Sequence, residues 1–125
     1  MDVRALSLDD WFRDAGISRW TAMKLDAEGS EPAVLRGAQN SIDRFRPFLI
    51  LEINGIVLQD AGFSGRDIIE FLSSRGYSVY QLSFRRLERW DLAKHGGFSE
   101  VLCLPGEREK NDLERLVRAG FSRPE

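Results

Sequence analysis

The sequence has little cysteine and histidine and no apolar stretch long enough to cross a membrane. Cys103 and His95 are the only residues of their types, which excludes an internal disulfide and a Cys/His zinc set. The strongest apolar run, residues 48–51, ends at Glu52, far short of the roughly 20 residues that a membrane helix needs. Acidic residues interrupt the N-terminal stretch, so it does not read as a signal peptide. We therefore expect a protein of a reducing compartment, the cytoplasm.

An excess of charge of one sign is also missing. The chain has 18 basic and 20 acidic residues and a net charge of −2, which gives no field to attract nucleic acid or an anionic membrane. We expect neither as a partner. A glycine-rich G-x-G turn after an apolar strand is absent as well. The 125 residues suffice for one domain with a single core, and we expect residues 1–125 to form it.

Hydrophobic periodicity and turn residues predict an α/β fold. The expected strands are residues 3–6, 20–26, 48–54, 77–83 and 98–104, and the expected helices are residues 8–15, 31–45, 66–75 and 109–119. Residues 55–65 read as a loop or short helix, and residues 84–97 as a loop or hairpin. Connections that contain helices favour parallel strands, whereas the last strand follows no obvious helix. The prediction is a partial doubly wound sheet, mostly parallel with an antiparallel last strand and helices on both faces.

Polar residues follow the two best-defined early strands where each ends. Asp26 and Glu28 follow the first of them, and Glu52 and Asn54 end the next. The carboxyl ends of parallel strands meet at one edge, which is where open α/β sheets bind ligands. We therefore expect a site at this edge, with Asp26 and Glu52 as catalytic candidates and Glu28 and Asn54 as candidates for substrate binding.

Each candidate also has a structural interpretation. Asp26 could pair with Lys24 or with backbone N–H groups, Glu52 could have a structural partner, and Asn54 could start a turn. Glu31 falls in the first turn of a helix, where an acid complements the helix dipole, and we interpret it as structural. The acids are ligand types that Mg²⁺ or Mn²⁺ accepts, but their spacing is not diagnostic and we assign no metal site.

Four motifs occur in an order and spacing typical of one family. They are Ser7-Leu8-Asp9-Asp10-Trp11, Lys24-Leu25-Asp26-Ala27-Glu28-Gly29-Ser30-Glu31, Val34-Leu35-Arg36-Gly37-Ala38, and Arg46-Pro47 followed by Leu49-Ile50-Leu51-Glu52-Ile53. With them the chain resembles the FkbM family of S-adenosylmethionine-dependent methyltransferases, most strongly over residues 6–82. The resemblance implies a Rossmann-like class I methyltransferase fold, S-adenosylmethionine as cofactor, and methyl transfer, expected to oxygen, on a sugar or another small metabolite.

One part of the family pattern is missing from these residues. Such enzymes bind the cofactor mainly through an earlier strand and its glycine-rich turn, so the chain resembles the C-terminal half of a methyltransferase domain and its cofactor-binding residues stay unassigned. The strand at residues 20–26 would then lie at a sheet edge with unpaired backbone groups, which invites pairing with a second copy or a partner chain. The alternative to an enzyme is a non-catalytic truncated remnant, or an interaction subunit that completes its sheet with a partner.

Overall fold

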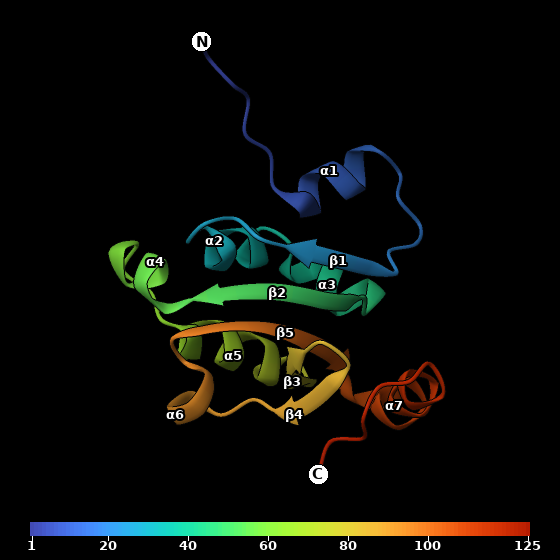
Figure 1. Cartoon of the computed structure of the whole chain (residues 1–125). Coiled ribbons are helices and arrows are strands. Elements are labelled where there is room, and N and C mark those ends of the chain that lie inside the picture. The colour runs from blue at the N-terminus through green and yellow to red at the C-terminus, as the bar shows by residue number, and fades with distance from the viewer.

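The computed structural model describes all 125 residues and contains one five-stranded sheet with helices packed on it (Figure 1). The strands are β1 (Ala22–Leu25), β2 (Phe48–Asn54), β3 (Tyr77–Ser83), β4 (Arg86–Arg89) and β5 (Phe98–Pro105). The helices are α1 (Leu8–Asp14), α2 (Glu31–Arg36), α3 (Gln39–Phe45), α4 (Gly55–Asp60), α5 (Gly65–Ser74), α6 (Leu92–His95) and α7 (Glu109–Arg118), with a 3₁₀ turn, η1, at Gly106–Arg108.

The sheet is mixed, and the prediction of a mostly parallel sheet is wrong. The strand order is β1-β2-β5-β3-β4. Only β1 and β2 pair in parallel, and the other three pairings are antiparallel. The cause is the position of β5, which lies between β2 and β3 and runs against both. Strands β1, β2 and β3 do point the same way, as their helical connections predict, but β3 does not contact β2 in the sheet.

Each face of the sheet carries its own apolar cluster. The larger one joins β2 and β5 to helices α2, α3 and α5, which lie together behind the sheet in Figure 1. Residues of β5 alternate between the faces: Val101 and Cys103 enter the larger cluster, whereas Leu102 and Leu104 enter the smaller one with Leu113 of α7. Helices thus lie on both faces of the sheet, but α7 covers only part of its face.

The expected strand at residues 3–6 does not form. Residues 1–7 have no regular structure because no strand of the sheet lies beside them, and residues 1–6 are exposed. Helix α1 begins as expected, since the Ser7 hydroxyl accepts a hydrogen bond from the Asp10 N–H. The strand expected at residues 20–26 is confined to the four residues that pair with β2.

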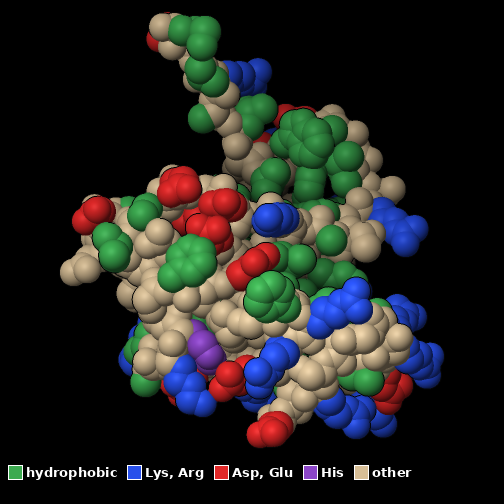
Figure 2. Space-filling model, in the orientation of Figure 1, with side chains coloured by type: hydrophobic (Ala, Val, Ile, Leu, Met, Phe, Trp, Pro, Cys, Tyr) green, Lys and Arg blue, Asp and Glu red, His purple; other side chains and the backbone are tan.

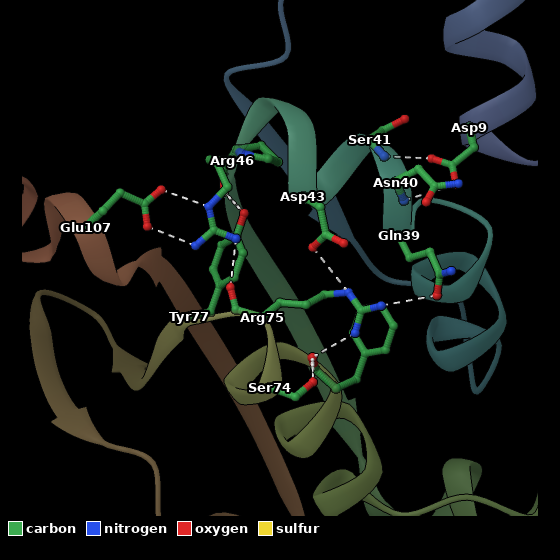
Figure 3. Close-up of polar contacts among 12 residues, drawn as sticks. Asp9, Gln39, Asn40, Ser41, Asp43, Arg46, Ser74, Arg75, Tyr77 and Glu107 are labelled. Carbon is green, nitrogen blue, oxygen red and sulfur yellow. Dashed lines mark hydrogen bonds and ion pairs between the residues drawn. The ribbon is translucent and has the colours of Figure 1, made fainter.

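The helix expected at residues 31–45 is broken into α2 and α3 at Gly37 and Ala38. Helix α1 docks at the break: the Asp9 N–H donates to the Gly37 carbonyl at 2.8 Å, and the Asp9 carboxylate accepts from Asn40 and Ser41 at 3.1 and 2.8 Å. Asp9 thereby caps α3, because the N-cap residue, Ala38, has no side chain that can do so (Figure 3).

Arg46 joins three elements where α3 ends. It ends the helix in a left-handed conformation, with φ of 52°, as the following proline disfavours the α region. Its guanidinium donates to both oxygens of Glu107 in η1, at 2.8 and 2.9 Å, and to the Arg75 carbonyl at the end of α5. It also lies over the Tyr77 ring of β3 (Figure 3). This pairing lowers the pKa of Glu107 to about 2.

No helix of the chain combines the length and the apolar character that crossing a bilayer requires.

Candidate active site

The turn that leaves β1 is held by a buried carboxylate. Glu28 and Gly29 have positive φ, 49° and 97°, and turn the chain toward α2. The Glu31 carboxylate, 3% exposed, accepts hydrogen bonds from the N–H groups of Ala27 and Gly29 at 2.7 and 2.9 Å. Glu31 therefore shapes the turn from within, in agreement with its structural interpretation, and leaves Asp26 and Glu28 on the exposed side.

Close backbone contacts fix this turn against its neighbours. A Cβ on Gly29 would lie 2.9 Å from a methyl carbon of Val57 in α4, and a Cβ on Gly55 would lie 2.6 Å from the Gly96 carbonyl oxygen. The Gly55 N–H also donates to the Gly97 carbonyl at 2.6 Å. Glycine is needed at these contacts because any side chain would push the segments apart. The ends of β1 and β2 and the start of β5 are thereby locked into one edge.

Three carboxylates converge at this edge. The pairing of Leu25 with Leu51 places Asp26 beside Glu52, and oxygen atoms of Asp26, Glu28 and Glu52 lie within 4.8 Å of one another. Figure 2 shows acidic side chains gathered in the upper left of the molecule, whereas most lysines and arginines cover its lower part. None of the chain's eight ion pairs involves these three residues, so Lys24 does not neutralise Asp26.

A fourth acid, Glu100 of β5, was not among the sequence candidates. It stands directly opposite Glu52 in the antiparallel pair β2–β5, where two like charges destabilise a sheet. Burial and the charges of Asp26, Glu28 and Glu100, in that order, raise the pKa of Glu52. The sequence does show a glutamate in a mostly apolar strand, but only the strand register reveals that Glu100 lies opposite Glu52.

Asn54 has a defined structural role. Its side-chain oxygen accepts a hydrogen bond from the Val57 N–H at 3.4 Å and caps α4. The side-chain oxygen of Asn54 therefore starts the turn into α4, as the structural interpretation expects, while its NH₂ group stays available for a ligand.

The 125 residues do not enclose a cofactor at the carboxylate edge. The four main cavities, of about 370 to 720 Å³, are lined by residues other than Asp26, Glu28, Glu52 and Asn54. The edge is an open surface, and β1 has no strand partner on the side away from β2. A cofactor the size of S-adenosylmethionine does not fit a site built from these residues alone, since a pocket buries most of such a ligand.

Three other polar or reactive side chains are paired or buried. The ring Nδ1 of His95 accepts a hydrogen bond from the Asp91 N–H at 2.9 Å. Cys103 is fully buried, and burial raises the pKa of its thiol. Arg89 pairs with Glu109 at 3.2 Å. The cluster of Asp26, Glu28 and Glu52 is by itself no evidence of a metal ion, because exposed acidic groups commonly lie close together without one.

The fold and this edge define a class: an α/β protein whose polar site lies at the carboxyl ends of parallel strands, as in Rossmann-like enzymes. Residues 1–79 match the family model of the methyltransferase FkbM domain. The chain therefore belongs to the FkbM methyltransferase family, whose members use S-adenosylmethionine. No curated protein and no solved structure matches it. Asp26, Glu28, Glu52 and Asn54 all lie within the matched residues, whereas Glu100 lies beyond them.

Proposed function

We propose that the chain acts in S-adenosylmethionine-dependent methyl transfer to a hydroxyl oxygen of a small metabolite or sugar. The observation that carries the proposal is the convergence of Asp26, Glu28 and Glu52 within 4.8 Å at the carboxyl ends of two parallel strands. Structural needs do not explain it, because the three acids repel one another and pair with no cation.

The residues present supply the acceptor side of the reaction. Glu52, with its raised pKa, is suited to take the proton of an acceptor hydroxyl, because a base works best when its pKa approaches the working pH. Asp26 accepts a second hydrogen bond from the acceptor and orients it. A cofactor held by the further segment would supply the methyl group, and the residues present here would only hold the acceptor hydroxyl and take its proton.

The cofactor side requires a further segment. The free edge of β1 is the place where another strand can pair, and it supports a cofactor pocket completed there by a second polypeptide segment. The Trp20 indole covers part of this edge, since it donates to the Ala22 carbonyl at 3.0 Å. The same edge supports the alternative that the chain is a non-catalytic remnant or an interaction subunit that completes its sheet with a partner.

Calorimetric titration of the chain with S-adenosylmethionine and with its demethylated product tests whether the chain builds a cofactor site by itself or as an oligomer. Saturable binding that is lost in Asp26→Ala and kept in Asp60→Ala would mean that it does; Asp60 is the control because it is an exposed acid of α4. A folded chain that binds neither compound would mean that it is half of a methyltransferase, inert until the further segment joins it.

Light scattering at high protein concentration tests the β1 edge. We expect self-association, and a monodisperse monomer would argue against pairing at this edge.

A further inference from the structure

Two large apolar side chains border the candidate active site without being buried. Phe98, the first residue of β5, is 63% exposed, and Ile56, in the first turn of α4, is 74% exposed. The segments that carry them touch, because the Gly55 N–H donates to the Gly97 carbonyl at 2.6 Å. Neither side chain belongs to an apolar cluster of the core. Figure 2 shows hydrophobic side chains directly beside the gathered acidic ones.

The strand register places Phe98 on the same face of the sheet as the polar candidates. Phe98 stands directly opposite Asn54, and Glu100 stands opposite Glu52. Side chains alternate along a strand, so these four share one face, while the residues between them are buried on the opposite face. The Cβ atoms of direct partners lie about 4.5 to 5.5 Å apart. Diagonal neighbours such as Phe98 and Glu52 lie about 7 to 8 Å apart, within reach of an aromatic side chain.

Exposure alone does not mark Phe98 as a binding residue. Phe84, in the β3–β4 turn, is 99% exposed as well, and single apolar residues on a surface need no explanation. Phe98 differs from it in its neighbours, which are the Asn54 NH₂ group and the carboxylates of Glu52 and Glu100. The two carboxylates enter none of the chain's ion pairs. An apolar ring therefore adjoins polar groups that have no charged partner.

This combination matches the chemistry of a cyclic sugar. A carboxylate accepts hydrogen bonds and an NH₂ group donates them, so hydroxyl groups, which do both, can satisfy each of these groups. An aromatic ring offers a flat apolar surface, and one face of a pyranose ring carries only C–H groups. An open-chain polyol has the hydroxyl groups without such a face. Small-molecule sites combine aromatic side chains with a few placed polar groups in the same way.

We propose that Phe98 is a substrate-binding residue that selects a cyclic sugar as the methyl acceptor. The apolar face of the sugar stacks on the Phe98 ring, and Ile56 borders it. The Asn54 NH₂ group donates to one hydroxyl, and a neighbouring hydroxyl faces the Glu52 carboxylate. The role of the sugar as acceptor rests on the proposed methyl transfer, whereas its binding does not require the cofactor.

Titration of the ¹⁵N-labelled chain with methyl β-D-glucopyranoside and with sorbitol, an open-chain hexitol, tests sugar binding without cofactor. We expect the glycoside to shift the amide signals of Asn54, Gly97 and Phe98, and sorbitol to leave them in place. Saturation of the aromatic protons should be transferred to the C–H protons of one sugar face. Phe98→Ala removes the stacked apolar area and should weaken binding about fivefold.

Further variants separate stacking from general apolar contact. Phe98→Trp keeps a flat ring and should bind at least as tightly as the parent chain, whereas Phe98→Leu keeps only apolar bulk and should bind more weakly. Phe84→Ala is the matched control, since it removes an exposed ring outside this edge, and it should leave the affinity unchanged. Equal affinity for the glycoside and sorbitol, or equal losses in Phe98→Ala and Phe84→Ala, would overturn the stacking site. So would a glycoside that shifts no signal.

Failure of this inference is distinguishable from failure of the proposed function. A chain that binds S-adenosylmethionine but no glycoside would refute the role of Phe98 and leave the methyl transfer standing. A chain that binds the glycoside through Phe98, but yields no methylated sugar when the further segment supplies the cofactor, would refute the methyl transfer and leave the sugar site standing.

Discussion

Replacing Glu31 by glutamine is the sharpest test of how the acidic turn is built. The carboxylate is buried and accepts two N–H groups. Glutamine keeps one acceptor oxygen, now uncharged, and turns its NH₂ group toward the other N–H. Hydrogen bonds to a charged group are each worth about 1.5 to 3 kcal/mol, and an unsatisfied buried donor costs about 1 to 3 kcal/mol. Glu31→Gln should therefore lower the free energy of unfolding by about 2 to 4 kcal/mol.

Urea unfolding followed by far-ultraviolet circular dichroism measures this loss. The midpoint should fall with an unchanged m value, and Tm should drop by roughly 8 to 16 °C at about 4 °C per kcal/mol for a domain of this size. Glu28→Gln makes the same chemical change at an exposed position of the same turn and should leave the midpoint nearly unchanged. If the two variants unfold at the same urea concentration, Glu31 does not hold the turn.

Three further changes probe other features. Glu52→Gln should stabilise the chain at pH 7, because a folded pKa above the unfolded one penalises only the ionised form. This gain should shrink as the pH falls through the raised folded pKa and be absent below the unfolded value of about 4.5; urea midpoints at pH 7 and pH 4 decide. Phe84 is 99% exposed, has φ of 54° and lies in the two-residue turn of the β3–β4 hairpin, a position that favours glycine. Phe84→Gly should therefore raise Tm by relieving about 1 kcal/mol of backbone strain. Phe84→Ala keeps a Cβ and should not raise Tm. Gly29→Ala should lower the free energy of unfolding by about 2 kcal/mol or more, because of the positive φ and the close contact with the Val57 side chain. Adding Val57→Ala removes that side-chain contact, so thermal unfolding should show the double variant regaining only part of the lost stability.

Local pattern was sufficient for most elements of the fold. Strands β2 and β3 have the predicted bounds, since an apolar run between turn residues leaves little choice. The meeting of Asp26, Glu28 and Glu52 also followed from strand direction alone, because neighbouring parallel strands end at one edge. Those inferences needed no knowledge of long-range contacts.

The remaining features depend on contacts between distant segments. The break between α2 and α3 arises where Asp9, far away in the chain, caps Asn40 and Ser41. Glu100 joins the acidic edge only through the register of β5. The place of β5 between β2 and β3 likewise reflects which strands pair, and periodicity does not encode pairing.

The place of β5 also determines when the sheet can form during synthesis. β5 is the last of these five strands to leave the ribosome, yet within the sheet it alone links the pair β1–β2 to the hairpin β3–β4. Until it arrives, the inner edges of β2 and β3 are open and can pair with other chains. The nascent chain therefore exposes two strand edges to aggregation until β5 is made, although the other elements already hold most residues of the larger apolar cluster.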